Sequence, residues 1–328
     1  MVKEISKEVV IGVDLGGSAI RLGVINDQGR LFGFKSIEIP QSRKKEVVLS
    51  LITEGIRKHI QDQISIGNNV LAVGIGSPGI INPDKGLVVT SPNFPGWTNV
   101  PLKSLLEKSF NLPVFLDNDA NSAAFGEKWR GAGRRVNSLV CLTMGTGIGG
   151  GIILNGEVWR GAHGMSGEIG HITVNPEGPK CNCGNYGCLE SYSSATGMVR
   201  SAIGSIKKGT RTILLRLTTG EIKKIDAKLI HEAAIKGDRL SLNILKEAGM
   251  YLGIAIANLM NILNPDMIVL TGAVTGSWDF FMPAAQLEVR KRALKTIVGR
   301  TRIVKGKLRG TAGIVGAAGI AWRQSGHI

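Results

Sequence analysis

The sequence predicts an α/β protein built from two related lobes. Two stretches share one pattern, in which a short apolar strand, a glycine turn and a second strand follow one another, at residues 9–25 and 139–154. Apolar residues at helical spacing in Glu46–Gln63 and Ser241–Leu263 supply the α component. The chain has 328 residues, which is enough for two domains that each bury a core.

The composition is that of a soluble globular protein, with 43% apolar and 20% charged residues. The longest apolar run, Tyr251–Leu263, is too short to span a bilayer, so a buried helix and no membrane partner are expected. The first eight residues contain no signal-peptide core. A cytoplasmic protein is therefore expected.

The formal net charge of +15 has two interpretations. The basic residues are scattered over Arg43-Lys44-Lys45, Lys207-Lys208, Arg290-Lys291-Arg292 and Arg300–Arg309. They either form solvated faces that favour anionic substrates or bind a specific polyanion. No basic run is interleaved with aromatic residues, so a nucleic-acid partner is not expected.

The first glycine turn is Asp14-Leu15-Gly16-Gly17-Ser18, between the predicted strands Val9–Val13 and Ile20–Ile25. Glycine leaves backbone N–H groups open to a phosphate at such a bend. Asp14, at the end of the strand, could hold a metal ion or its water. The alternative is a turn that binds nothing.

The second glycine turn, Met144–Gly147, lies between the predicted strands Leu139–Thr143 and Gly151–Leu154. Its place matches that of the first turn, so each lobe is expected to offer one glycine hairpin to a nucleotide held between them. Nothing matches the P-loop pattern GxxxxGK[ST]. Strands follow the glycines where a dinucleotide-binding fold would have a helix, which argues against that fold.

Polar residues follow two further predicted strands. Val70–Gly76 leads into the sharp turn Ser77-Pro78-Gly79. In the loop Ser91–Trp97, which is rich in turn formers, Asn93 could bond a ligand hydroxyl or serve only the turn.

Asp119 stands between a predicted strand, Val114–Leu116, and a predicted helix, Ala120–Trp129. Strand ends and helix starts are where α/β folds usually place catalytic groups. Asp is also common as a helix N-cap. The residues alone leave both roles open.

Three of the four cysteines fall within eight residues, and a histidine precedes them by ten residues. The set is His171, Cys181, Cys183 and Cys188. In a reducing compartment such clustering favours a metal over a disulfide. Four protein ligands suit a tetrahedral structural zinc, which would fix the loop carrying Glu190 and the segment carrying Glu168. Free buried thiols are the alternative.

The C-terminal part is predicted to be architectural. The expected helices are Ile222–Lys236, Ser241–Leu263 and Gly310–Trp322, the last one packing back on the first lobe. The strand Met267–Leu270 is followed by Thr271–Val274, a turn of small residues that could accept an adenine.

With these motifs the sequence resembles the ROK family of sugar kinases and repressors, within the actin/hexokinase superfamily. The resemblance runs almost end to end. It rests on DLGGS at Asp14, GSPG near Ser77, SPNFPGW at Ser91, DNDAN at Asp117, MGTGIGGG at Met144, GEIGH ending at His171, and CNCGNYGCLE at Cys181. The SPNFPGW motif is most like the bacterial glucokinases of that family.

The resemblance implies an actin-like ATPase (ribonuclease H-like) fold, duplicated, with two lobes and a central cleft. Residues 1–118 would form the small α/β lobe, with a C-terminal helix at about 310–328 packing back on it. Residues 119–309 would form the large α/β lobe with the zinc-binding loop.

The resemblance also implies ATP-dependent phosphorylation of a hexose, with Mg²⁺ bound to the ATP and with structural Zn²⁺. Glucose at its 6-hydroxyl is the expected acceptor, and Asp119 the general base. The sugar would be bound by Gly79, Asn93, Asn118, Asp119, Glu168, His171 and Glu190. The nucleotide would be bound by Asp14, Gly16, Gly17, Ser18, Gly145, Thr146, Gly147, Gly272 and Ala273, where the family usually has a glycine pair or triplet at the last two positions. Zinc would be bound by His171, Cys181, Cys183 and Cys188.

Three alternatives stay open under this resemblance. The acceptor could be N-acetylmannosamine, N-acetylglucosamine, fructose or mannose, or polyphosphate could replace ATP. The chain could also be a sugar-responsive transcriptional regulator, but such members carry a helix-turn-helix module before the first strand, and only about ten residues precede Asp14 here. The family further suggests a homodimer or homotetramer.

Overall fold

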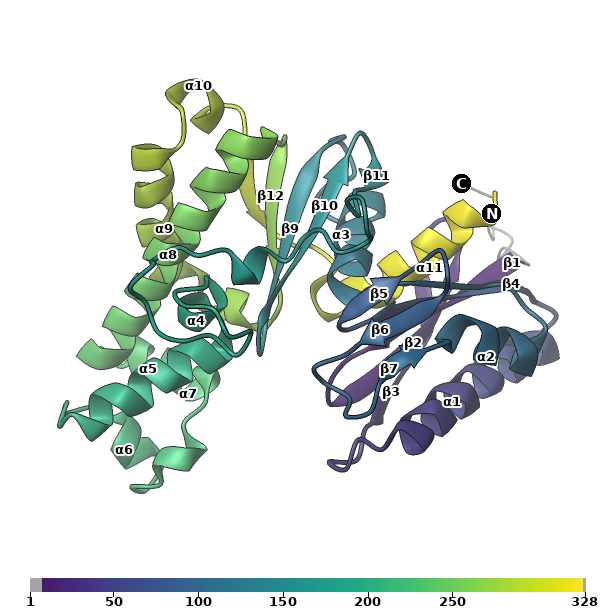
Figure 1. The fold of residues 1–328 in the computed structure, drawn as a ribbon, viewed down its shortest axis with the longest axis horizontal. Helices are drawn as coiled ribbons and strands as arrows, with labels where there is room; N and C mark the ends of the chain where they lie inside the picture. Colours follow the sequence, from purple (N-terminus) through teal and green to yellow (C-terminus); the bar gives the residue numbers. More distant parts are fainter. Residues whose placement is uncertain (1–7, 327–328) are drawn as a thin grey trace, which may run out of the picture. The chain divides into compact units, whose positions relative to one another are not determined.

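A computed structural model describes residues 8–326 and divides them into two compact units. Unit 1 comprises the described residues up to Cys141, then Gly151–Gly167, then those from Gly306 onward; unit 2 comprises Leu142–Gly150 and Glu168–Lys305 (Figure 1). The lobe boundaries at 118/119 and 309/310 stay predictions. Residues 1–7, which carry most of the expectation of no signal peptide, and residues 327–328 lie outside the described chain.

Unit 1 is built on a five-stranded sheet with the order β3-β2-β1-β4-β8. Its strands are β1 (Glu8–Leu15), β2 (Ala19–Asn26), β3 (Leu31–Glu38), β4 (Asn69–Ser77) and β8 (Val114–Asn118). β1 pairs antiparallel with β2 and parallel with β4, and β4 pairs parallel with β8. The carboxyl ends of β1, β4 and β8 therefore meet at one edge of the sheet, where open α/β sheets bind ligands.

Alternate residues of β1 pack into two different hydrophobic cores, one on each face of the sheet. Val9, Ile11 and Val13 pack with the buried face of α1 (Lys45–Ser65) and with α2 (Leu102–Phe110). Val10 packs instead with α11 (Ala312–Gln324). The period of two in a β-strand produces this division. A small three-stranded sheet completes the unit, with β5 (Ile80–Asn82), β6 (Leu87–Thr90) and β7 (Thr98–Val100).

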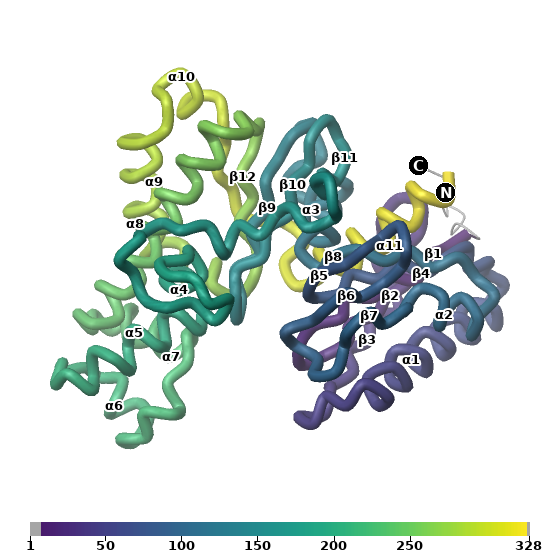
Figure 2. Tube along the Cα trace, in the orientation of Figure 1, coloured from purple at the N-terminus to yellow at the C-terminus, as the bar shows by residue number. Residues whose placement is uncertain are grey.

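Helix α11 lies against α3 (Asp119–Trp129) and against β1 and β4, as the traces in Figures 1 and 2 show. Trp322 is fully buried, and its Nε1 donates to the Ile25 carbonyl at 3.3 Å. The crossing of the two helices depends on glycine, because a methyl group on Gly316 would overlap the Ser122 carbonyl oxygen. Absence of a side chain lets the two backbones approach closely.

The buried Glu127 fixes the chain that leads into α11. Its carboxylate accepts the backbone N–H groups of Ala132 (2.7 Å), Lys307 (3.0 Å) and Leu308 (2.9 Å). These bonds join the end of α3 to the short helix η4 (Arg309–Thr311) that precedes α11. A buried carboxylate with three such donors is well compensated.

A second five-stranded sheet has the order β11-β10-β9-β12-β13. Its strands are β9 (Leu139–Met144), β10 (Ile148–Leu154), β11 (Glu157–Val158), β12 (Met267–Thr271) and β13 (Arg302–Lys305). The order in the chain repeats that of the first sheet, with β10 and β11 antiparallel and β12 and β13 parallel. The predicted strand–turn–strand repeat and a duplicated α/β fold are confirmed.

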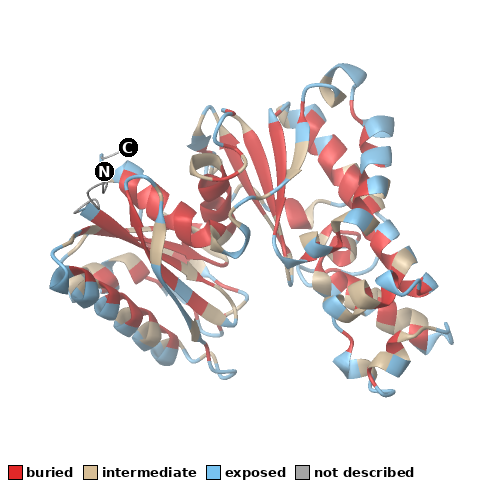
Figure 3. Ribbon diagram, turned by 180° about the vertical axis from the view of Figure 1, so that it is seen from behind, coloured by how far each residue is buried: buried red, intermediate tan, exposed pale blue. Residues whose placement is uncertain are grey.

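Unit 2 carries most of the remaining helices. They are η1 (Ile169–His171), α4 (Glu190–Ser193), α5 (Ala195–Lys207), α6 (Leu214–Leu217), η2 (Ile222–Lys224), α7 (Ala227–Ile235), α8 (Arg239–Leu263), η3 (Ala273–Ser277), α9 (Trp278–Arg292) and α10 (Lys295–Val298). Helix α8 packs on α9 and is long and apolar enough to cross a membrane, but 61% of that stretch is buried within the protein (Figure 3). The interpretation of its apolar run as a buried helix agrees with this.

One predicted helix, Ile222–Lys236, is wrong as a single element. The structure has the short η2 and then α7, separated at Ile225 and Asp226. The Asp226 carboxylate accepts the Leu229 N–H at 2.8 Å and so caps a new helix. The predicted turn Thr271–Val274 similarly continues into η3.

Replacing Gly316 by Ala tests the close helix crossing. The added methyl should force α3 and α11 apart and destabilise the protein by about 1–3 kcal/mol. The matched control is Gly204→Ala in α5, where the new methyl would meet nothing beyond its own stretch of helix; it should stabilise by about 0.5–1 kcal/mol. Urea denaturation midpoints measure both, and equal shifts in one direction would contradict the packing described.

Candidate functional site

Asp14 is the last residue but one of β1, at the edge of the unit 1 sheet where open α/β sheets usually bind ligands. Its carboxylate lies against Gly313 of α11 and 3.2 Å from Arg21 Nη1. Burial raises the pKa of Asp14, and the nearby Arg21 cation opposes that rise. The following turn closes where Gly16 donates to the Ala19 carbonyl at 2.9 Å. A single carboxylate beside a glycine turn is a suitable oxygen donor for Mg²⁺ that enters with a nucleotide.

The glycine turn of unit 1 touches the predicted sugar loop. A β-carbon built on Gly17 would lie 2.8 Å from Asn93 Nδ2, so the Asn93 side chain rests directly on the turn. Ser18 is exposed, and its carbonyl accepts the Ile39 N–H at 2.9 Å. The structure thus brings together residues predicted for the phosphate and for the sugar.

Asn118 and Gly79 join the same group. Asn118 Nδ2 donates to the Gly79 carbonyl at 3.1 Å. Gly79 has φ +105°, which favours glycine, and a side chain there would overlap the Thr90 carbonyl just before the Ser91 loop. A continuous set of contacts therefore runs from Asn118 through Gly79 to the loop that carries Asn93.

Asp119 is the first residue of α3. The cap of this helix is Asn118, whose side-chain oxygen accepts the N–H groups of Ala120 (2.8 Å) and Asn121 (3.2 Å). The capping role considered for Asp119 thus belongs mainly to its neighbour. Asp119 itself is half-buried and lies beside Gly76 near the end of β4.

Asp117 was not predicted to have a role, yet it organises this strand end. It is 3% exposed, and Arg160 Nε and Nη2 donate to its Oδ2 at 2.9 and 2.5 Å. Its Oδ1 accepts the Asn118 N–H at 2.8 Å and Asn121 Nδ2 at 3.0 Å. Arg160 lies just after β11, 43 residues from Asp117, and no motif or spacing links the two. The sequence therefore carries no signal for this ion pair.

In unit 2 the glycine turn is held by the start of α5. Gly145 donates to the Gly147 carbonyl at 2.9 Å, and the Gly145 carbonyl accepts the Ala195 N–H at 2.9 Å. Thr196 Oγ1 donates to the Thr146 carbonyl at 2.8 Å. These bonds fix the backbone of all three residues predicted to bind phosphate in this unit.

Glu190 reaches the same turn. Its Oε2 accepts the Ile148 N–H at 2.9 Å, and a side chain on Gly147 would overlap that oxygen. On another side, Gly272 has φ +96° and lies against the Met144 carbonyl. Gly272 and the exposed Ala273 therefore lie next to the strand end from which the phosphate turn begins.

Glu168 and His171 lie at the two ends of a short segment that packs on β10. A side chain on Gly170 would overlap the Ile148 carbonyl, so the segment is tightly seated. His171 Nε2 lies 4.0 Å from Glu168 Oε2. The structure thus brings Glu168, His171 and Glu190 to the residues around Ile148.

The four predicted metal ligands form one cluster. One ligand atom from each of His171, Cys181, Cys183 and Cys188 lies within 4.8 Å of all the others. Cys181 Sγ is 3.7 Å from His171 Nδ1, and Cys183 Sγ is 3.7 Å from Cys188 Sγ. Two thiolates on a tetrahedral zinc, each bonded at about 2.3 Å, stand about 3.8 Å apart. The cluster fits structural Zn²⁺.

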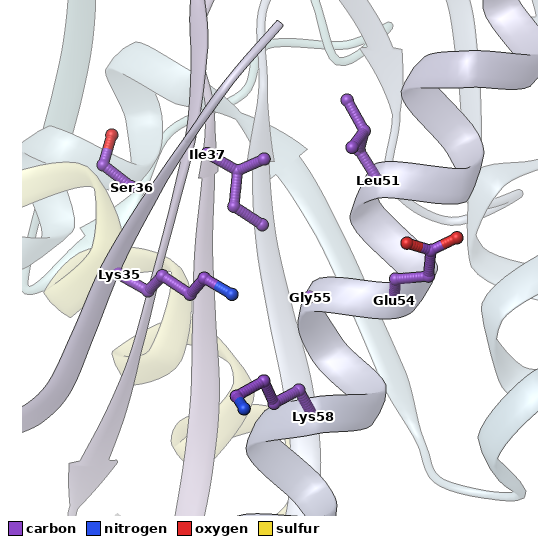
Figure 4. A pocket seen from close by; sticks show the side chains of 7 residues that line it. All are labelled: Lys35, Ser36, Ile37, Leu51, Glu54, Gly55 and Lys58. Atoms are coloured by element: carbon purple, nitrogen blue, oxygen red, sulfur yellow. The ribbon is translucent and has the colours of Figure 1, made fainter.

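The predicted site residues thus form two groups, one in each unit. The group in unit 1 contains Asp14, Gly16, Gly17, Ser18, Gly79, Asn93, Asn118 and Asp119, and the group in unit 2 contains Gly145, Thr146, Gly147, Glu168, His171, Cys181, Cys183, Cys188, Glu190, Gly272 and Ala273. A separate cavity of about 350 Å³ lies between β3 and α1 (Figure 4). It is lined by Lys35, Ser36, Ile37, Leu51, Glu54, Gly55 and Lys58, none of which belongs to either group.

The profile of the ROK family matches residues 10–324. The chain belongs to the ROK family. It is 38% identical to a glucokinase of Thermotoga maritima, with 97% of this chain and 98% of that protein covered. It is 35% identical to a putative xylose repressor of a Caldicellulosiruptor species, with 95% of this chain and 78% of that protein covered.

Among solved structures, the fold is similar to a ROK family glucokinase from Streptomyces griseus in complex with glucose and AMPPNP. The TM-score is 0.81 at 34% identity, with 96% of this chain and 99% of that chain covered. The predicted family and fold class are confirmed.

Replacing Cys183 by Ser tests the metal cluster. Loss of one thiolate should abolish stoichiometric zinc, because three remaining ligands close the site poorly. The control is Cys141→Ala, which removes a buried thiol outside the cluster and should keep the zinc. Metal content measured by mass spectrometry decides, and undiminished zinc in the Cys183 variant would rule out this ligand set.

Proposed function

We propose that this chain is an ATP-dependent hexose kinase that transfers the γ-phosphate to the 6-hydroxyl of D-glucose. One observation carries the proposal: Asp14, Gly79, Asn118 and Asp119 all lie at, or directly after, the carboxyl ends of the parallel strands β1, β4 and β8. A phosphate turn and polar groups for a hydroxylated ligand thus share one edge of one sheet. The likeness to glucokinases over nearly the whole chain agrees with it.

Asp119 is the general base in this proposal. The oxygen of the sugar 6-hydroxyl attacks the γ-phosphorus, and the bond from that phosphorus to the bridging oxygen breaks, leaving its electron pair on ADP. The hydroxyl proton passes to the Asp119 carboxylate. Asn118, which caps α3 and bonds Gly79, fixes the backbone that carries this carboxylate.

The remaining sugar contacts are assigned to Asn93 and Gly79 in unit 1 and to Glu168, His171 and Glu190 in unit 2. His171 points Nδ1 at the Cys181 thiol and Nε2 toward Glu168, so one ring can bind zinc and also face the sugar. A metal that holds one ring nitrogen orients the other. Zinc is structural here, because four protein ligands leave no open position.

The phosphates are assigned to Gly16, Gly17 and Ser18 in unit 1 and to Gly145, Thr146 and Gly147 in unit 2. Gly272 and Ala273 are assigned to the adenosine. Asp14 would hold Mg²⁺ or its water, and the ion supplies positive charge that offsets the phosphates when the nucleotide is bound. We place the enzyme in the cytoplasm and expect a homodimer or homotetramer, as in the family.

Replacing Asp119 by Asn tests the general base. Turnover should fall by about 10²–10⁴, because the amide cannot accept the hydroxyl proton. Glucose affinity should change little, since the amide still bonds a hydroxyl. ADP release measured with glucose, and glucose binding followed by calorimetry, separate the two effects.

The control for this variant is Asp84→Asn, on an exposed loop of unit 1. It should be as active as the unchanged protein. Near-normal turnover of the Asp119 variant would refute its role. A panel of hexoses and amino sugars in the same ADP assay, with ATP and polyphosphate compared as donors, identifies the substrates.

A second function is favoured by the similarity to a putative xylose repressor, namely sugar-responsive binding of DNA. The two functions differ in a gel-shift measurement with and without glucose. We expect no shift of DNA at physiological salt. A sugar-dependent shift together with no turnover on any hexose would favour the regulator.

A further inference from the structure

The basic run Arg43-Lys44-Lys45 has no part in the reaction as assigned above, yet its first residue bonds Asn93, whose side chain rests on the phosphate turn of unit 1. Arg43 lies near the end of the segment that joins β3 to α1, just before the N-cap residue Lys44. At the start of this segment, Ile39 donates to the Ser18 carbonyl at 2.9 Å. A tight turn follows, in which the Arg43 N–H bonds the Pro40 carbonyl at 2.9 Å. The segment is thus fixed to the glycine turn before it reaches Arg43.

The Arg43 side chain contacts the loop that carries Asn93. Its Nη1 donates to the Asn93 carbonyl at 3.3 Å. The Asn93 side chain in turn rests on Gly17. The guanidinium therefore lies within one residue of the point where the phosphate turn meets the sugar loop. Because Gly17 is assigned to the phosphates and Asn93 to the sugar, this junction is where the proposed function would place the transferred phosphoryl group.

The charge on Arg43 is available to a ligand. Among residues 8–326, Arg43 takes part in no ion pair, and its one recorded side-chain acceptor is the Asn93 carbonyl. A guanidinium carries five N–H donors in a planar fork, so four remain. This fork matches the oxygens of a phosphoryl group, and it stays charged at any working pH.

We propose that Arg43 binds the phosphoryl group during transfer, at the junction of Gly17 and Asn93. This inference rests on the proposed hexose kinase function and adds a catalytic residue to it. As the bond to ADP breaks and the bond to the sugar oxygen forms, negative charge spreads over the non-bridging oxygens. Arg43 donates hydrogen bonds to these oxygens, while the proton of the hydroxyl goes to Asp119.

The first test compares Arg43→Met with Lys44→Met. Both remove one positive charge from adjacent positions, and Lys44 is exposed with no recorded side-chain bond. The left-handed φ of +46° at Arg43 costs Met and Arg alike, since both carry a β-carbon. We expect Arg43→Met to lower kcat by about 10²-fold and Lys44→Met to stay near the unchanged rate. Equal rates in the two variants would overturn the proposal.

A second readout separates phosphoryl binding from mere support of Asn93. Glucose binding to the Arg43 variants is measured by calorimetry, as for the Asp119 variant. Glucose affinity should be kept in Arg43→Met, and Arg43→Lys should recover part of the lost kcat, because it restores a cation without the fork. A loss of glucose affinity as large as the loss of kcat would assign Arg43 a structural role and overturn the proposal.

A third readout does not depend on turnover. Inorganic pyrophosphate, titrated by calorimetry in the absence of sugar, should bind at least about tenfold more weakly to Arg43→Met than to Lys44→Met. If the unchanged protein phosphorylates no hexose, the proposed function fails, but this difference would still support a phosphate contact at Arg43. Equal pyrophosphate affinity would overturn it whatever the activity.

Discussion

The buried carboxylate of Asp117 is the constraint on which the candidate site of unit 1 depends. A charge at 3% exposure must be compensated, and here four N–H donors meet its two oxygens. Arg160 supplies two of them, and Asn118 and Asn121 supply the others. Asn118 and Asn121 belong to the junction of β8 and α3, and Arg160 follows β11, so these bonds tie that junction to a distant part of the chain. The cap at Asn118, its bond to Gly79 and the position of Asp119 all follow from that junction.

Unit 2 reaches a comparable rigidity by different means. A cluster of three thiols and one imidazole fixes the loop that ends at Glu190, and Glu190 then bonds the backbone at Ile148. The glycines at positions 147, 170 and 272 matter because a side chain at each would overlap a neighbouring oxygen. The zinc cluster, the Glu190 carboxylate and the glycine turn Gly145–Gly147 are thus connected to one another. We infer that loss of zinc would displace the phosphate turn as well as the residues assigned to the sugar.

The sequence predicted the features that depend on local pattern. Apolar runs ending at glycine turns marked β1, β2, β9 and β10, and the spacing of three cysteines and one histidine marked the metal cluster. It misjudged Ile222–Lys236, because a single capping residue, Asp226, restarts a helix inside an otherwise helical stretch. The exposed strand β3 and the short strands β5–β7 carry little alternation and were not predicted.

The long-range contacts that organise the site could not be predicted from the sequence, for a different reason. Arg160 stands 43 residues from Asp117, and Arg43 stands 50 residues from Asn93. Neither separation corresponds to the spacing of a helix or a strand. Each contact forms only when distant strands and loops come together in the folded chain. Motifs therefore predicted candidate ligand-binding residues, whereas the residues that hold these candidates in place could be found only in the folded chain.

The most direct test of the account is a crystal structure of the protein with glucose and a non-hydrolysable ATP analogue. The account predicts a carboxylate oxygen of Asp119 within about 2.6–3.2 Å of the sugar 6-hydroxyl. It would be contradicted by a glucose whose 6-hydroxyl is bonded elsewhere while the Asp119 carboxylate lies outside hydrogen-bonding reach.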